Sequence, residues 1–225
     1  MNEPAPLVEP NPDAPDYSGR PLAPDRLSAI EEFAGPSVLD VGCGNGAYVL
    51  RYADRFAIRG VDYQRFDSWN RRPELFSLGD AGKLDQPDSS VDTILSFETL
   101  EHLPDPRTAL VEYLRVCRRN VILTVPNCAL TPGMRASGII YNHWVDRTHL
   151  NFWDLESISA LVREVGFAVK VARPINQISM GSVVAESLGL GGFLARTFAR
   201  GFRVIARPRY HMTTLVVCEK PSRNP

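Results

Sequence analysis

A short apolar run that leads into three alternating glycines constrains the fold of this chain more than any other feature. Residues 38–46 read VLDVGCGNG, so Gly42, Gly44 and Gly46 follow directly on a stretch of strand-forming residues. Because glycine adopts positive φ without steric cost, this spacing predicts a strand that turns tightly into a helix. The bare backbone of such a turn also allows a ligand to lie against it.

Charge separates the two cofactor classes that this turn fits. Gly42, Gly44 and Ala47 satisfy the G-x-G-x-x-G/A pattern of dinucleotide sites, and Asp62 lies at a suitable distance downstream. Asp40, however, stands two residues before the first glycine, where a carboxylate disfavours a pyrophosphate. The same carboxylate suits a cation such as S-adenosylmethionine (SAM), which carries a sulfonium and an ammonium group. The turn therefore favours SAM over a nicotinamide dinucleotide, and the structural alternative is that Asp40 only hydrogen-bonds the loop.

Strands and helices alternate along most of the chain. Strands are predicted at residues 37–41, 58–63, 75–79, 91–97, 120–125, 167–171 and 213–218. Helices are predicted after Pro24 and at residues 47–53, 106–117 and 154–165. This alternation predicts an α/β domain over residues 24–221, with a doubly wound, mostly parallel sheet that helices cover on both faces. Residues 1–23 contain six prolines among small and acidic residues and are predicted to form a disordered tail.

The composition of the chain limits the classes of partner that it is expected to bind and the cellular compartment in which it is expected. The 225-residue chain has 25 Lys plus Arg against 26 Asp plus Glu, a balance that gives no overall field for nucleic acid or an acidic membrane. Its four cysteines form no CxxC pair and indicate reduced thiols, not a disulfide framework or a zinc site. No apolar run is long enough to span a bilayer, and the Pro-rich start does not resemble a signal peptide. We therefore expect a cytoplasmic protein.

Three further strand ends carry side chains suited to an adenosine. Asp62 ends the second strand, where a carboxylate accepts hydrogen bonds from both ribose hydroxyls or, alternatively, only shapes the turn. Asp80 follows the third strand, where it would accept the adenine amino group while Ala81 leaves room for the ring. Phe97 ends the fourth strand, beside the point at which ligands bind in open parallel sheets.

These segments together resemble one enzyme family. The runs VLDVGCGNG, GVDY, GDAGKLDQPDSSVDTILSFETLEHL and VILTVPN, within residues 37–127, are similar in order and spacing to the class I SAM-dependent methyltransferases. The resemblance implies a Rossmann-like sheet of seven strands with the last strand reversed. It also implies that the glycines shape the methionine pocket, with Asp40 near the amino group. The residues assigned to the cofactor are Asp40, Gly42, Gly44, Gly46, Asp62, Asp80, Ala81 and Phe97.

An acidic and imidazole-rich segment follows the fourth strand. If this segment turns helically, Glu98, Glu101 and His102 would share a face at the mouth of the SAM crevice. The loop that carries His149 can reach the same opening. The E-x-x-E-H element with a later His resembles small-RNA 3′-end 2′-O-methyltransferases and ubiquinone-biosynthesis O-methyltransferases. That resemblance implies a divalent metal ion, such as Mg²⁺, Mn²⁺ or Zn²⁺, held by Glu98, Glu101, His102 and His149.

A second interpretation of the same segment needs no metal. Glu101 and His102 would then hold the loop, while His149 acts as a general base or binds the substrate. The candidate catalytic residues are therefore His149, Glu98 and His102, and His143 is an alternative base.

The last two predicted strands are about forty residues apart, which is more than a hairpin requires. A helical insertion is predicted at about residues 175–210, with five arginines beside apolar residues at helical spacing. Such an insertion would cap the active site, contact an anionic substrate or lie on a membrane surface. Alternatively, its helices pack on the edge of the sheet with their arginines solvated.

The expected reaction is methyl transfer from SAM to a hydroxyl oxygen of a small molecule or of a glycan or lipid precursor, such as a sugar, a phenol or a lipid-linked compound. Nitrogen and carbon acceptors are alternatives to oxygen. RNA 2′-O-methylation is the alternative within the same chemistry, and the neutral charge disfavours it. A SAM- or nucleotide-binding protein without turnover and a nicotinamide oxidoreductase are the alternatives outside it.

Overall fold

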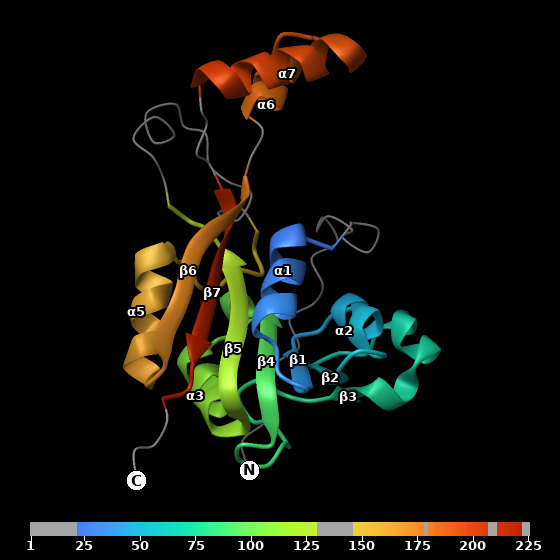
Figure 1. Cartoon of the computed structure of the whole chain (residues 1–225), viewed down its shortest axis with the longest axis vertical. Coiled ribbons are helices and arrows are strands. Elements are labelled where there is room, and N and C mark those ends of the chain that lie inside the picture. The colour runs from blue at the N-terminus through green and yellow to red at the C-terminus, as the bar shows by residue number, and fades with distance from the viewer. Residues whose placement is uncertain (1–21, 130–145, 178–179, 207–210, 222–225) are drawn as a thin grey trace.

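A single mixed sheet organises the chain. The computed structural model describes residues 22–129, 146–177, 180–206 and 211–221. Its seven strands lie in the order β3-β2-β1-β4-β5-β7-β6 (Figure 1). They are β1 (Ser37–Val41), β2 (Ala57–Asp62), β3 (Phe76–Leu78), β4 (Val91–Phe97), β5 (Cys117–Pro126), β6 (Ala168–Gln177) and β7 (His211–Glu219). Among them β7 runs antiparallel to both of its neighbours, so the predicted fold class and the reversed last strand are confirmed.

Two strands extend three residues or more beyond a predicted end. β5 begins at Cys117 instead of residue 120, and β6 continues to Gln177 instead of residue 171. β6 lies at the edge of the sheet, is mostly exposed or half-buried and contains Pro174, so its sequence lacks a continuous apolar signal. Pairing with β7 as far as Gln177 and His211 supplies the backbone hydrogen bonds that extend it.

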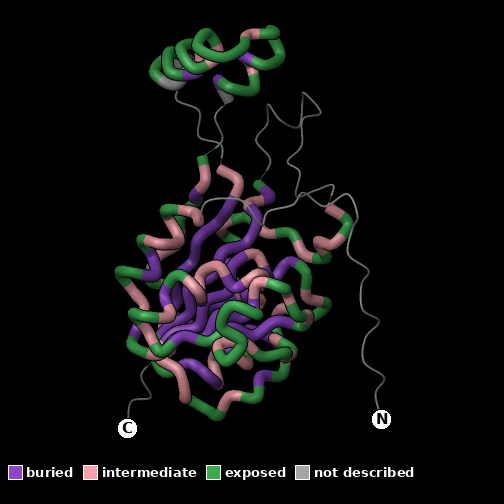
Figure 2. Tube along the Cα trace, turned by 90° about the vertical axis from the view of Figure 1, so that its right-hand side faces the viewer, coloured by how far each residue is buried: buried purple, intermediate pink, exposed green. Residues whose placement is uncertain are grey.

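Helices cover both faces of the sheet. The covering helices are α1 (Pro24–Phe33), α2 (Ala47–Tyr52), α3 (Pro106–Val116) and α5 (Leu155–Val165). The described residues also form 3₁₀ turns η1 (Asp67–Arg71), η2 (Pro73–Leu75) and η3 (Leu100–His102), and two further helices outside these layers, α6 (Met180–Ser187) and α7 (Gly192–Ala206). Successive residues of β1 point to opposite faces, so Val38 packs in one core with Ile30 of α1, and Leu39 packs in the other with Tyr113 of α3. Figure 2 shows the buried strands enclosed between these layers.

Local sequence signals fix α5 at both ends. Asp154 accepts a hydrogen bond from the Ser157 backbone at 2.8 Å, and the Ser157 hydroxyl lies 3.0 Å from the Asp154 backbone nitrogen, which completes a capping box. Gly166, with φ of 115°, ends the helix in the left-handed region. The helix therefore starts at a defined point directly after the segment that carries His149.

α6 and α7 stand apart from the sheet. Figures 1 and 2 show this helical hairpin beyond the end of β6, away from the cores. Gln177 pairs with His211, and Thr213 pairs with Pro126 at the carboxyl end of β5, so the hairpin emerges from the carboxyl edge of the parallel strands. The two helices do not pack on the edge of the sheet, one of the alternatives considered above. In the described part of the chain, no helix combines the length and the apolar character needed to cross a bilayer.

Candidate active site

The predicted glycine turn joins β1 to α2. Gly42, Gly44 and Gly46 have φ of 72°, 52° and 73°, so all three take the left-handed conformation that their spacing predicts. A Cβ at Gly42 would lie 2.3 Å from the Thr99 hydroxyl oxygen, which leaves no room for a side chain. A Cβ at Gly44 would meet no described atom within 4 Å, so this backbone faces open space.

The outer side of the turn is held by a residue that the sequence analysis missed. Trp69 of η1 donates its indole N–H to the Gly44 carbonyl at 2.8 Å, and Ser68 donates to the Asn45 carbonyl at 2.7 Å. Trp69 is fully buried and stacks on Phe76 with 4.9 Å between ring centroids. Only the arrangement of the sheet brings η1 to the turn, so no motif in the sequence indicated this contact.

Asp40 is an isolated buried carboxylate beside the turn. It is 2% exposed, and its Oδ2 has no hydrogen-bond partner among the described residues. Burial, together with the nearby Asp62, raises the pKa of Asp40 to about 7, although Arg26 acts in the opposite direction. A buried carboxylate oxygen without a hydrogen-bond donor is costly, so this position favours a ligand that brings positive charge or hydrogen-bond donors.

The other predicted cofactor residues lie at neighbouring strand ends. Asp62 accepts the Gly44 N–H at 2.8 Å and the Gln64 N–H at 3.2 Å, and burial raises the pKa of its carboxyl group. The Asp62 carbonyl in turn accepts the Gly79 N–H at 2.9 Å, which brings the Asp80 turn beside β2. Asp80 accepts the Gly82 N–H at 2.8 Å within that turn.

Two predicted cofactor residues contribute apolar surface. Ala81 packs against the core that contains Leu39 and Tyr113. Phe97 is buried at the end of β4, and the Tyr48 ring meets its ring edge-on with 4.9 Å between centroids. The structure thus collects all the predicted cofactor residues at the carboxyl edge of β1 to β4.

Arg26 of α1 is a second residue that the sequence analysis did not identify. Its guanidinium donates to Glu98 Oε1 at 2.7 Å and lies 5.2 Å from the Phe97 ring centroid. Its Nε is buried without a hydrogen-bond partner among the described residues, and its charge lowers the pKa of Asp40. A guanidinium and a carboxylate therefore face the same space beside the glycine turn. No local pattern indicated this role, because Arg26 and Glu98 are 72 residues apart in sequence.

Glu98 does not share a face with Glu101 and His102. Glu98 has φ of 52°, and the 3₁₀ turn η3 begins only at Leu100, so the segment does not leave β4 as a continuous helix. Its carboxylate points instead to Arg26 of α1, with which it forms an ion pair. Of the four predicted metal ligands, three come together and Glu98 lies outside their group.

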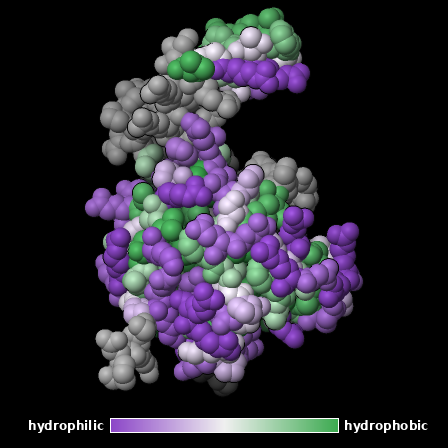
Figure 3. Space-filling model, viewed as in Figure 1, coloured by the Kyte–Doolittle hydropathy of each residue, from purple (hydrophilic) through white to green (hydrophobic). Residues whose placement is uncertain are grey.

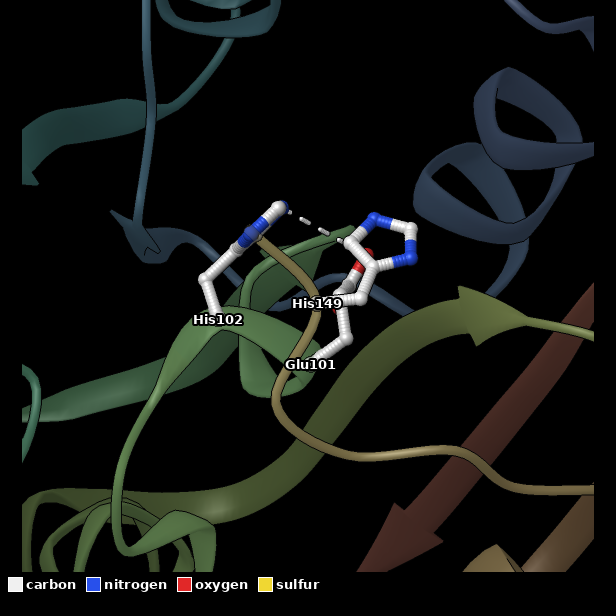
Figure 4. Close-up of side chains that lie close together, drawn as sticks. All are labelled: Glu101, His102 and His149. Carbon is white, nitrogen blue, oxygen red and sulfur yellow. Dashed lines mark ion pairs between the residues drawn. The ribbon is translucent and has the colours of Figure 1, made fainter. Parts of the chain in front are cut away.

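Glu101, His102 and His149 form a compact cluster (Figure 4). One potential ligand atom from each lies within 4.8 Å of the others, and the two imidazole rings meet edge-on at 4.9 Å. Glu101 is fully buried, and neither of its carboxylate oxygens has a hydrogen-bond partner among the described residues. Burial raises the pKa of Glu101 well above its usual range, and the charge of Glu98 adds to this effect.

Backbone contacts hold the His149 segment against η3. The Glu101 carbonyl accepts the Leu150 N–H at 2.8 Å and the Asn151 N–H at 3.1 Å. His102 Nδ1 lies 3.1 Å from the Thr148 carbonyl, and burial lowers the pKa of His102. The His149 side chain is largely buried, with its Nε2 3.7 Å from an Asp146 carboxylate oxygen. His143, the alternative base, lies outside the described residues.

Comparison with known proteins identifies the family. A family model described as a methyltransferase domain matches residues 20–170, well over half of the chain. The chain belongs to the class I SAM-dependent methyltransferases. The matched region of this methyltransferase includes the glycine turn, the strand-end acids and the cluster around Glu101, and the predicted family is thereby confirmed.

Curated relatives of this methyltransferase act on different acceptors, as their names state. A 27-O-demethylrifamycin SV methyltransferase of Amycolatopsis mediterranei is 27% identical over 174 residues, covering 70% of this chain and 64% of the relative. A phosphatidylethanolamine N-methyltransferase of Cereibacter sphaeroides is 29% identical over 112 residues, covering 45% and 55%. A 2-methyl-6-phytyl-1,4-hydroquinone methyltransferase of Synechocystis is 32% identical over 131 residues, covering 53% and 37%. The methyltransferase therefore spans less than two thirds of each of these relatives.

Solved structures share the fold of this methyltransferase. Phosphoethanolamine N-methyltransferase 2 of Haemonchus contortus, in complex with SAM, superposes with a TM-score of 0.62 at 17% identity, covering 88% of this chain and 52% of that one. A SAM-dependent methyltransferase from Archaeoglobus fulgidus superposes with a TM-score of 0.60 at 20% identity, covering 87% and 93%. At such identities the likeness concerns the fold alone.

Proposed function

We propose that this chain transfers the methyl group of SAM to a hydroxyl oxygen of a small molecule or of a glycan or lipid precursor. The observation that carries the proposal is the buried Asp40 carboxylate, whose Oδ2 has no hydrogen-bond partner among the described residues, at a glycine turn of the methyltransferase family. Two of the relatives are named for an oxygen-methylated antibiotic and for a phytyl hydroquinone, and a third for a phospholipid amine. These names support a small-molecule or lipid-like acceptor and leave nitrogen and carbon as the alternative acceptor atoms.

The two charges beside the turn match the amino-acid end of SAM. That end is a zwitterion, so its ammonium group needs an acceptor and its carboxylate needs a donor. Asp40 accepts from the ammonium group, while Arg26 turns from Glu98 to the carboxylate, a strong charge-assisted pairing. Gly44 lies against the ligand because its backbone faces open space.

The strand ends beyond the turn hold the adenosine. Asp62 accepts from the ribose hydroxyls, and Asp80 accepts from the adenine amino group beside Ala81. Phe97 closes the pocket below the methionine chain. Asp62 already binds the Gly44 N–H, so one carboxylate both shapes the turn and meets the cofactor.

His149 is the general base for the acceptor. The acceptor oxygen attacks the methyl carbon in line with the carbon–sulfur bond, whose electron pair leaves with the sulfur. The hydroxyl proton passes to His149, and the products are the methyl ether and S-adenosylhomocysteine. Glu101 and His102 position His149, through the backbone contacts of its segment and the ring contact with His102.

A divalent metal ion at the cluster is the second candidate. The donor set supports it, because one carboxylate and two imidazoles converge and both Glu101 oxygens are buried without partners among the described residues. Glu101, His102 and His149 would hold the ion, and Glu98 would join them only by leaving Arg26. A bound ion would orient the acceptor and make its hydroxyl more acidic. Exhaustive EDTA treatment of the purified protein separates the cases: full activity afterwards excludes the metal.

A turnover assay tests the proposed function. Purified protein is incubated with SAM and a panel of sugars, phenols, lipid-linked precursors, amines and RNA, and S-adenosylhomocysteine is quantified by mass spectrometry. We expect product with a hydroxyl acceptor, and His149→Ala should lower kcat by about 10²- to 10⁴-fold while SAM still binds. SAM binding without S-adenosylhomocysteine from any acceptor would indicate a protein that binds the cofactor without turnover, and product with RNA alone would favour the nucleic-acid alternative.

A further inference from the structure

The hairpin of α6 and α7 buries small residues where its two helices meet and exposes several large apolar ones, while Phe198 and Phe202 are half-buried and stack on each other. A Cβ at Gly181 would lie 2.8 Å from the Ala199 Cα, so the two helices approach closely at this point. Ala185 and Ala199 are buried there. In contrast, Phe193 is 77% exposed and Val204 is 78% exposed. Val183, Leu188 and Leu194 are the other exposed large apolar residues among those of the hairpin whose burial the structure describes. A helical hairpin that is stable in water usually has the reverse arrangement.

Positive charge accompanies this apolar surface without any negative charge on α7. Arg196 and Arg200 are exposed one turn apart, and the sequence continues with three more arginines at positions 203, 207 and 209. The sequence contains no acidic residue from Ser187 to Cys218. The basic helix thus matches an anionic surface and repels a second copy of itself, because each copy would bring the same uncompensated arginines.

The apolar side of the hairpin faces away from the sheet. In Figure 3 hydrophobic residues gather on the far side of α7, and hydrophilic residues lie along the side toward the rest of the molecule. This orientation does not suit a cap, which would turn its apolar side toward the active site. It does suit a flat surface beyond the hairpin, with the arginines at the level of that surface.

We propose that α6 and α7 dock on the surface of a bilayer that contains anionic phospholipids. α7 has 15 residues, about 22 Å of helix, which is too short to cross the hydrocarbon core. The helix lies in the plane of the interface, with Phe193, Leu194 and Val204 below the headgroups and the arginines among the phosphates.

Docking would place the carboxyl edge of the sheet toward the bilayer. The hairpin emerges from the edge that carries the glycine turn and the cluster around Glu101. An amphiphilic acceptor would then reach the site without passing through bulk water. The docking itself does not depend on which acceptor is methylated, so its test is separate from the turnover assay.

Vesicle flotation with the full chain tests the proposal. The probes are vesicles of phosphatidylcholine alone and vesicles with about 30 mol% phosphatidylglycerol, whose negative surface potential attracts basic helices. We expect the protein to float with the anionic vesicles and to stay in the soluble fraction with the neutral ones. Raising NaCl from about 0.1 M to about 0.5 M should release most of it, because the charge attraction is screened.

Matched variants assign the binding to the hairpin. Val204→Glu should lower the partition coefficient by about tenfold or more, whereas Val111→Glu, at an exposed valine on α3, should not change it. The double variant Arg196→Glu/Arg200→Glu should also lose binding, and Arg51→Glu/Arg163→Glu controls for the same change in net charge. SAM binding by every variant shows that it is folded.

Three results would overturn the proposal. The first is wild-type protein that stays in the soluble fraction with anionic vesicles. The second is a Val204→Glu variant that floats as well as wild type. The third is a dimer, seen by light scattering, that Val204→Glu dissociates while vesicle binding is absent, since the apolar side would then bind a second copy.

Discussion

Burial raises the pKa of the Asp40 carboxyl group, in the proposed cofactor site, into the neutral range. Its pKa of about 7 arises from desolvation and the neighbouring Asp62, partly offset by Arg26. Below that pH the free protein holds a proton on Asp40, whereas a bound ammonium group favours the ionised form. Cofactor binding must therefore release this proton when the pH is below about 7.

The affinity for SAM should fall as the pH drops through 7. Because the raised pKa belongs to the free protein, Kd should rise by up to about tenfold for each pH unit below it. Calorimetric titration between about pH 6 and pH 8, in buffers of different ionisation enthalpy, measures both Kd and proton release. Asp40→Asn should bind weakly and lose this part of the pH dependence. A wild-type slope identical to that of Asp40→Asn would contradict the assignment.

A second prediction concerns the contribution of the Arg26 side chain to the affinity for SAM. Arg26→Ala should raise Kd for SAM by roughly 10- to 100-fold, as expected for a lost charge-assisted hydrogen bond of about 1.5–3 kcal/mol. The control ligand is 5′-methylthioadenosine, which lacks the amino-acid end and should bind wild type and variant alike. Equal weakening of both ligands would show that Arg26 only supports the fold, and thermal unfolding of the variant checks this directly.

At the scale of structural elements, the proposed role of the glycine turn requires free space beside its backbone as well as positive φ angles. Gly44 and Gly189 both have positive φ, 52° and 69°, and a Cβ at either would meet no described atom within 4 Å. The same substitution therefore costs similar backbone strain at both positions. The positions differ in that Gly44 lies beside Asp40 and Asp62, whereas Gly189 lies between α6 and α7.

Gly44→Ala and Gly189→Ala form a matched pair. In denaturant unfolding without ligand, Gly44→Ala should destabilise the protein by about 1 kcal/mol, whereas Gly189→Ala strains only the separately packed hairpin and should change global unfolding less. Only Gly44→Ala should weaken SAM binding, by roughly tenfold or more, because its methyl group enters the space of the cofactor. Equal affinities of the two variants would place the ligand elsewhere.

On the scale of the whole molecule, the hairpin and the sheet form separate packing units. The buried residues of α6 and α7 contact each other, and both helices stand away from the sheet (Figures 1 and 2). Gln177 and His211 are paired neighbours at the base of the hairpin, so a short loop can join them. Loss of the hairpin should therefore leave the two cores intact.

Replacing residues 178–210 with a short Gly-Ser loop should give a folded protein. We expect its melting temperature to stay within about 4 °C of wild type, a change of about 1 kcal/mol or less, because the cores keep their contacts. SAM affinity should be unchanged, while flotation with anionic vesicles should disappear. If the shortened protein loses both its affinity for SAM and its cooperative unfolding transition, the hairpin supports the sheet.

Some of the candidate site could be predicted because its signals are local. The glycines, Asp40 and the strand-end acids each lie at a fixed position relative to a strand, and parallel strands bring their carboxyl ends to one edge. The E-x-x-E-H spacing was equally visible, but it predicted that Glu98 would face Glu101. In the structure the φ of Glu98, 52°, and its ion pair with Arg26 direct its side chain away from Glu101. Sequence spacing alone encodes neither feature.

By itself the sequence determined the α/β alternation, the cofactor turn, the capping of α5 and the family, because hydrophobic period, glycine spacing and caps act within a few residues. Only the tertiary structure decided that Arg26 meets Glu98, that Trp69 holds the turn, that Glu101 is buried beside His149 and that the hairpin stands clear of the sheet. These contacts join residues far apart in the chain. They form only once strand order and core packing have fixed which segments become neighbours.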